Sequence, residues 1–258
     1  MGKNYMRGDF LSYGRRIYPI LFLTACITVV IAVIFFALWF GRYQNNKRLP
    51  ASLSGDFNSR TFVIDPGHGG EDGGTFADDG TAEKELNLKM ANAVSLLFEL
   101  NGNNVRMTRT EDTLLYDHYN DLENYKGKKK IYDLKNRVRI TEEYENPVYI
   151  GIHMNSYPIP KYKGLQVYYS RNDSSSMTLA EAIQRNTSKY IQDWNVRSVK
   201  KADSSIYILD NLHCSAVLIE CGFLSNSDDL ASLKDLEYRR DMSCVIFASA
   251  LFSCIDKE

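Results

Sequence analysis

The sequence has few features that would assign a function on their own. Its formal net charge at pH 7 is −1, so it carries no excess of basic residues that would attract nucleic acid. It contains no internal repeat, no long low-complexity tract and no cysteine pair with the CxxC spacing of many metal sites. The five cysteines lie in or near apolar segments. We therefore expect buried free thiols, and the sequence places no disulfide.

The longest apolar segment is residues 20–40, which read ILFLTACITVVIAVIFFALWF. This run has no charged residue, glycine or proline, and as a helix it would span roughly 30 Å, the thickness of the hydrocarbon layer of a membrane. It ends in Leu38-Trp39-Phe40, unlike the small residues that precede a signal-peptide cleavage site. We interpret it as an uncleaved transmembrane signal anchor; secretion after cleavage is the alternative.

The segments on either side of this span suggest the remaining organisation. Four basic residues precede the span and three follow it, a small difference that favours a cytoplasmic segment at residues 1–19. Residues 41–59 are polar and contain Pro50 and Gly55, as expected of a stalk. Residues 60–258 are then expected to form one folded domain, since 44% hydrophobic and 24% charged residues are typical of globular chains.

Hydrophobic periodicity in residues 60–258 alternates between that of strands and that of helices. Strands are expected at 61–65, 104–108, 148–153, 164–169 and 216–221, and helices at 83–100, 133–144, 177–194 and 236–255. Residues 111–130 fit neither period and are expected to form a surface loop. Strands separated by helices predict an α/β fold, an open and mostly parallel twisted sheet with helices on both faces.

The first expected strand runs into a glycine-rich loop, TFVIDPGHGGEDGG at residues 61–74. No Lys-Ser or Lys-Thr follows and no basic residue lies in the glycine-rich part, so it does not have the pattern of a phosphate-binding loop. The glycines at 67, 69 and 70 instead allow a tight turn and leave space beside His68.

Three polar residues lie at or near the carboxyl ends of different strands. His68 follows the first strand, His153 ends VYIGIH, and Glu220 lies in the apolar strand AVLIEC. Sites in open α/β sheets form at this edge, so these side chains are expected to converge. By contrast, His118 and His213 are expected to be structural or exposed.

Two imidazoles and one carboxylate form a known ligand set for catalytic zinc, which keeps a position open for water. A further carboxylate must then act as the base. Glu83, at the start of a helix after the glycine-rich loop, is one candidate, but spacing ranks it little above its acidic neighbours Glu71, Asp72 and Glu85.

The motifs together resemble those of the zinc-dependent N-acetylmuramoyl-L-alanine amidases of the type-3 amidase family. The matching stretches are VIDPGHGGEDGGT, GTAEKELNL, VRMTR, YIGIHMNS and VLIECGFLSN, in the family's order across residues 60–255. The resemblance implies one Zn²⁺ ion bound by His68, Glu83 and His153. It also implies Glu220 as the acid/base in hydrolysis of the amide between N-acetylmuramic acid and L-alanine.

Four further residues are candidates for supporting roles. Asp65 is a candidate to orient an imidazole, although a turn or cap role is equally compatible with its position. Asn155 is a candidate for substrate contact or loop stabilisation. Arg109 and Arg137 are candidates to bind peptide carboxylates, against the alternative that they solvate the surface.

The implied substrate would place the domain outside the membrane, where peptidoglycan lies. Two other functions remain open: a wall-binding module that does not cleave, and a zinc peptidase that acts on the stem peptide. The membrane-anchored, single-domain layout is also compatible with a germination-type amidase of the spore cortex, by analogy alone.

Overall fold

The structure, a computed structural model, describes Phe22, residues 60–119 and residues 128–253. The expected segment at 1–19, the span at 20–40 apart from Phe22, and the stalk at 41–59 lie outside these residues. Within the described part of the chain, no helix combines the length and apolar character needed to cross a membrane.

A six-stranded sheet with the order β2-β1-β3-β6-β4-β5 organises the domain. Its strands are β1 (Thr61–Pro66), β2 (Asn104–Met107), β3 (Val148–Asn155), β4 (Gln166–Tyr169), β5 (Lys200–Lys201) and β6 (Ser215–Phe223). The strands β2, β1, β3 and β6 are parallel, and β4 pairs antiparallel to β6. The mostly parallel sheet is therefore confirmed, with β4 and β5 running against the other four strands.

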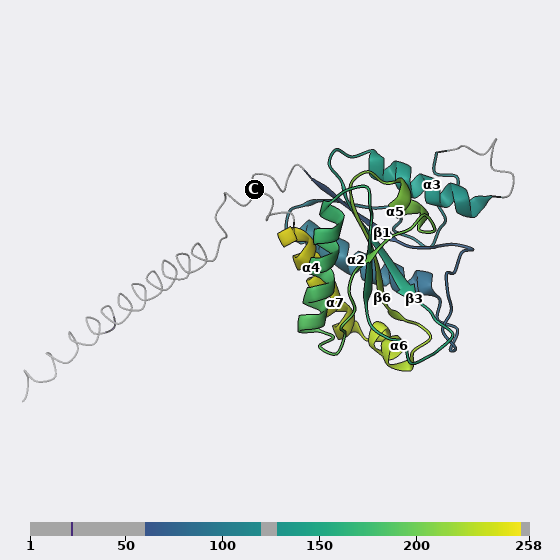
Figure 1. Cartoon of the computed structure of the whole chain (residues 1–258). Helices are drawn as coiled ribbons and strands as arrows, with labels where there is room; N and C mark the ends of the chain where they lie inside the picture. Colours follow the sequence, from purple (N-terminus) through teal and green to yellow (C-terminus); the bar gives the residue numbers. More distant parts are fainter. Residues whose placement is uncertain (1–21, 23–59, 120–127, 254–258) are drawn as a thin grey trace, which may run out of the picture. The chain divides into compact units, whose positions relative to one another are not determined.

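Helices cover both faces of this sheet (Figure 1). One face packs on α2 (Glu83–Leu100), α4 (Ser175–Tyr190) and α7 (Leu236–Ser253). The other face packs on α3 (Lys129–Glu142) and α5 (Tyr207–Asn211). Side chains of β1 alternate between the two cores, since Phe62 and Ile64 face the first and Val63 faces the second.

The helix α2 has the expected bounds, and its buried stripe includes Leu86, Met90 and Val94. The expected fourth member, Leu97, is only half-buried, and Phe98 is buried instead. Its ring stacks on Phe62 with a centroid distance of 4.1 Å. This contact fixes α2 against β1, the strand that leads into the glycine-rich loop.

Three short elements are absent from the sequence-based expectation: β5, α5 and α6 (Ser227–Lys234). The expected surface loop at 111–130 also needs correction. Leu114 and Leu115 are buried, and the main chain of Leu115 donates to Asp133 Oδ1 at 2.7 Å. The described part of this segment therefore packs against α3 next to the glycine-rich loop.

Candidate metal centre

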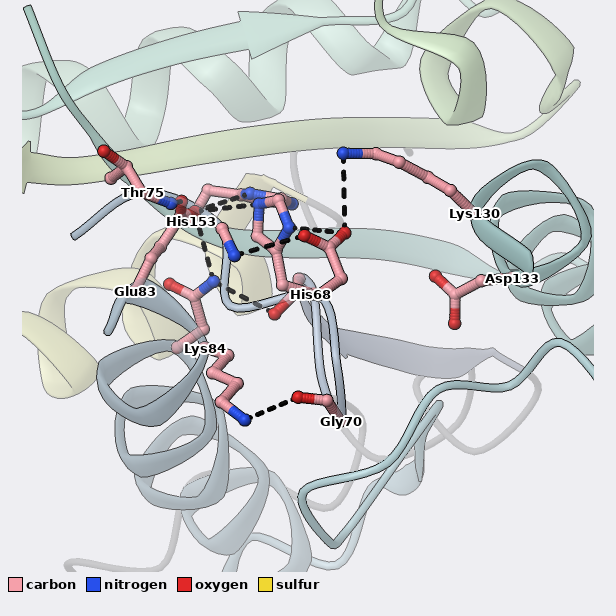
Figure 2. Close-up of polar contacts among 12 residues, drawn as sticks. His68, Gly70, Thr75, Glu83, Lys84, Lys130, Asp133 and His153 are labelled. Atoms are coloured by element: carbon pink, nitrogen blue, oxygen red, sulfur yellow. Dashed lines mark hydrogen bonds and ion pairs between the residues drawn. The ribbon is translucent and has the colours of Figure 1, made fainter. Parts of the chain in front are cut away.

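His68, Glu83 and His153 come together from three separate elements (Figure 2). His68 lies on the loop after β1, Glu83 is the first residue of α2, and His153 lies near the end of β3. One ligand atom from each residue can be chosen so that all three lie within 4.8 Å of one another. His68 and His153 therefore lie close together, as expected from the strands they follow. The other two histidines, His118 and His213, are exposed.

One carboxylate oxygen of Glu83 contacts both imidazoles. Its Oε1 lies 3.0 Å from Nδ1 of His153 and 3.3 Å from Nε2 of His68. Burial raises the pKa of Glu83, but the hydrogen bonds and charges of His153 and His68 outweigh burial and hold it well below its ordinary value. The side chain is therefore an ionised carboxylate between two nitrogen donors, a set that fits a zinc ion.

The second oxygen of Glu83 and its neighbours fix the orientation of the carboxylate. Oε2 accepts a hydrogen bond from the main chain of Thr75 at 2.9 Å. Oε1 also accepts from the main chain of Met154 at 3.2 Å and from Asn87 Nδ2 at 3.3 Å. Asn87 is buried one turn along α2 and donates in addition to the carbonyl of Gly67. These hydrogen bonds together hold the Glu83 carboxylate in one orientation.

Two glycines are required by the close packing of these side chains. A Cβ atom at Gly67 would lie 2.1 Å from the ring of His153. A Cβ atom at Gly74, whose φ is +69°, would lie 2.5 Å from Glu83 Oε2 and 2.8 Å from His68 Cδ2. The glycine-rich loop therefore leaves space for the whole set, and not only beside His68.

Glu220 lies directly beside His153, because the two residues pair in register between β3 and β6. Its Oε2 is buried and has no hydrogen-bond partner within the described part of the chain. Burial raises the pKa of Glu220 to about 7, despite the opposing effect of His153. Such a carboxyl can take up and release a proton near neutral pH, as a general acid/base must.

Asp65 is one candidate to orient an imidazole, but the contact with the imidazole of His68 is made by Asp72. Asp72 Oδ2 lies 3.0 Å from Nδ1 of His68. Asp65 is fully buried, and its carboxylate accepts hydrogen bonds from Thr108, Tyr149 and Arg137. Sequence spacing ranks Asp72 only as an alternative ligand, although its place four residues after His68 in the same loop is a signal for this contact.

Arg109 and Arg137 are buried, although the sequence predicts that both are exposed at the surface. The sequence suggests them as surface ligands for peptide carboxylates, but their exposed fractions are 3% and 1%. Both guanidinium groups donate to main-chain carbonyls of the glycine-rich loop. They are therefore part of the interior that supports this loop.

A sequence model of the N-acetylmuramoyl-L-alanine amidase family matches residues 62–250. The chain belongs to this family. It is 30% identical over 231 residues to the germination-specific N-acetylmuramoyl-L-alanine amidase of Bacillus subtilis (strain 168), which covers 89% of this chain and 92% of that protein.

Solved structures of amidases have the same fold. The CwlD amidase from Clostridioides difficile, solved in complex with the GerS lipoprotein, has a TM-score of 0.70 and 32% identity, covering 76% of this chain and 99% of that chain. The N-acetylmuramoyl-L-alanine amidase AmiC2 of Nostoc punctiforme has a TM-score of 0.65 and 28% identity. This match covers 76% of this chain and 98% of that chain. The similarity thus includes the amidase domain, with all four of His68, Glu83, His153 and Glu220 inside the matched range.

Asn155 ends β3 at the same edge of the amidase domain. Its side-chain oxygen accepts from the main chain of Ser156 at 2.8 Å, and its carbonyl accepts from the main chain of Leu224 at 2.8 Å. The first contact is local, and the second joins the end of β3 to the residue that follows β6. Loop stabilisation is therefore visible for Asn155, and contact with substrate stays a prediction.

Proposed function

We propose that the protein hydrolyses the amide bond between N-acetylmuramic acid and L-alanine in peptidoglycan, using one zinc ion bound by His68, Glu83 and His153. The observation that carries the proposal is the arrangement of three donor atoms within 4.8 Å of one another, with Glu220 beside them on the neighbouring strand. Membership of the amidase family supports the same reaction.

His68, Glu83 and His153 would hold the zinc ion, which would lower the pKa of a bound water and polarise the substrate carbonyl. Glu220 accepts a proton from the attacking water as the oxygen bonds to the lactyl carbonyl carbon. The carbon–nitrogen bond then breaks, and Glu220 gives the proton to the leaving amine of L-alanine. The products are a lactyl carboxyl group on the glycan and a peptide with a free L-alanine amine.

The raised pKa of Glu220 is suited to both halves of this cycle. A carboxyl group whose pKa burial raises is a stronger base for the proton of the attacking water, and it can release that proton to the amine afterwards. Asp72 supports the reaction indirectly, since its contact with Nδ1 of His68 leaves Nε2 directed at Glu83.

We further propose that residues 20–40 anchor the chain in the bacterial cell membrane. Residues 1–19 would lie in the cytoplasm, and residues 41–59 would connect the span to an extracytoplasmic catalytic domain at 60–258. The uncharged apolar run supports the anchor, and the extracellular location of peptidoglycan supports the orientation. N-terminal sequencing of the mature protein tests this: an intact N-terminus in the membrane fraction is expected, and a new N-terminus after residue 40 would show a secreted enzyme instead.

Digestion of purified walls tests the reaction. Vegetative and spore peptidoglycan are incubated side by side with the zinc-loaded protein, and the products are identified by mass spectrometry. A free lactyl carboxyl and a free L-alanine amine are expected. Cleavage only between amino acids would show a peptidase, and wall binding without products would show a binding module.

The two substrates also separate the physiological roles. The name of the Bacillus subtilis relative supports spore cortex as the preferred substrate. Faster release of product from spore peptidoglycan is therefore expected, and preference for vegetative wall would favour a role in cell separation or wall turnover.

A further inference from the structure

The guanidinium group of Arg137 is fully occupied in the interior beneath the glycine-rich loop. Its Nη1 donates to the carbonyl of Pro66 at 2.9 Å and to Asp65, and its Nη2 donates to the carbonyl of His68 at 2.7 Å. Asp133 accepts from Nε at 2.8 Å and from Nη2 at 3.4 Å. An arginine has five N–H donors, so none is left for a substrate.

Arg109 approaches the same loop from the end of β2. Its Nε donates to the carbonyl of Pro66 at 2.9 Å, and its Nη2 donates to the carbonyl of Gly67 at 3.0 Å. The other contacts are with the carbonyls of Lys84 and Glu111. Together the two arginines hold three consecutive carbonyls, those of residues 66, 67 and 68, and we call this pair the arginine clamp.

The clamp acts on a main chain in an uncommon conformation. The backbone of His68 has a φ of +61°. This value lies in the left-handed region, which residues other than glycine seldom adopt. Such a conformation persists only where its surroundings enforce it. The hydrogen bond from Arg137 to the carbonyl of His68 acts at this residue, and the imidazole that it carries reaches Glu83 and Asp72.

The charges of the clamp are balanced inside the protein. Asp65 and Asp133 face Arg137, which gives two buried carboxylates for two buried guanidinium groups. Asp65 in turn accepts from Tyr149 Oη at 2.5 Å, a residue of β3. Buried ion pairs contribute little to net stability after desolvation, whereas their directional hydrogen bonds fix geometry. The cluster is therefore suited to linking the position of the loop to that of the sheet.

We propose that Arg137, assisted by Arg109, is a positioning residue that holds His68 in its left-handed conformation and thereby sets the affinity of the site for zinc. This inference rests on the proposed function, in which His68, Glu83 and His153 bind the ion. Lysine has three donors on one nitrogen and cannot reproduce the planar fork that contacts Pro66, His68 and Asp133 at once.

The test compares three substitutions of the same kind in the full-length chain in mild detergent: Arg137→Lys, Arg109→Lys and, as the control, Arg171→Lys. Arg171 pairs with Asp210 at the surface, away from the loop. For each folded variant, zinc affinity is measured by competition with a chromophoric chelator, and thermal unfolding is followed separately without metal. Affinity reports on the site, whereas a purely structural role would change only thermal unfolding.

We expect Arg137→Lys to weaken zinc binding by about tenfold to a hundredfold, the usual effect of removing support from a metal ligand. Arg109 does not contact the His68 carbonyl, so Arg109→Lys should weaken zinc binding less. The zinc affinity of Arg171→Lys should equal that of the wild type. If Arg137→Lys does not fold, the zinc affinity of Arg109→Lys decides: weaker binding than in Arg171→Lys supports the inference, and equal binding overturns it.

Wild-type affinity in a folded Arg137→Lys variant would overturn the inference. Failure of both clamp variants to fold would also overturn it, because the pair would then serve global stability alone. A wild-type chain that binds no zinc would instead refute the proposed function, so the two failures are distinguishable.

Discussion

Oε1 of Glu83 lies 3.0 Å from Nδ1 of His153, although the two residues are 70 positions apart in the sequence. The contact exists because α2 begins at Glu83, next to the loop that leaves β1, and β1 is paired with β3. The same oxygen also reaches His68. One carboxylate at a helix start is thus fixed between two imidazoles, and this arrangement makes the assigned roles testable.

The roles of ligand and base can be separated by two substitutions. His68→Ala removes one of three donors and should lose zinc and activity together. Glu220→Gln keeps all three donors and should retain zinc while turnover falls by at least about a hundredfold, the usual contribution of a general acid/base. Bound zinc is measured by elemental analysis beside an activity assay on purified wall. Loss of zinc from Glu220→Gln would mean that ligand and base are assigned the wrong way round.

The packing of Gly67 against His153 predicts a site defect from one added methyl group. A Cβ atom there would lie 2.1 Å from the imidazole ring, so in Gly67→Ala the ring must move. We expect zinc affinity to fall by about tenfold or more. Gly80→Ala is the control, because its Cβ meets nothing within 4 Å while its φ of +83° still imposes backbone strain. The control should lose about 1 kcal/mol of stability and keep its zinc affinity. Equal zinc affinities in both variants would contradict the prediction.

Asp72 is expected to tune the site through His68. Asp72→Asn removes the charge that faces Nδ1 and should lower zinc affinity by about tenfold, since outer partners of ligating histidines have effects of this size. Asp228→Asn is a matched control: Asp228 is an exposed acid paired with Lys163, as Asp72 is paired with Lys130. Chelator competition on both variants gives the comparison. An effect of the same size in the control would point to a general charge effect.

The lowered pKa of Asp65 predicts that the folded protein becomes less stable in acid. Burial raises its pKa, but Arg137 and the hydrogen bonds from Thr108 and Tyr149 outweigh burial, so the folded-state pKa lies below the ordinary 3.8. The unfolded state then binds the proton more tightly. The stabilisation is therefore present above about pH 4 and is lost as the pH falls through the folded-state pKa.

Urea denaturation of the wild type and Asp65→Asn at several pH values measures this effect. The wild type should lose free energy of unfolding more steeply below about pH 4, because the variant lacks the titrating group. At pH 7 the variant should be less stable by about 3–5 kcal/mol, since Arg137 loses a buried partner. Parallel acid profiles would show that Asp65 is not the responsible group.

Much of the fold could be predicted because its long elements have clear periodicity. The helix α2 has the predicted bounds, and β1, β3 and β6 lie within three residues of theirs. The helices α5 and α6 could not be predicted in this way, because five and eight residues give too little of a helical repeat. The antiparallel direction of β4 was also out of reach, since an alternating strand pattern is the same in both directions.

The places of the candidate site residues could be predicted from the ends of strands, whereas their hydrogen-bond partners could not. His68, His153 and Glu220 were placed by the strands that precede or contain them. Glu83 could be chosen over its acidic neighbours only from the family resemblance. The burial of Arg109 and Arg137 was missed, because an arginine is usually exposed and its acidic partners lie far away in the sequence.

The sequence by itself determined the α/β class, the family and the edge of the sheet at which the polar residues meet, because periodicity and motif order are local properties of the chain. Only the tertiary structure decided which group each of these residues contacts. Asp72 rather than Asp65 faces His68, and Arg137 holds a carbonyl that is 69 positions away. Hydrogen bonds act over about 3 Å, so their partners are fixed only when packing has brought distant segments to that range.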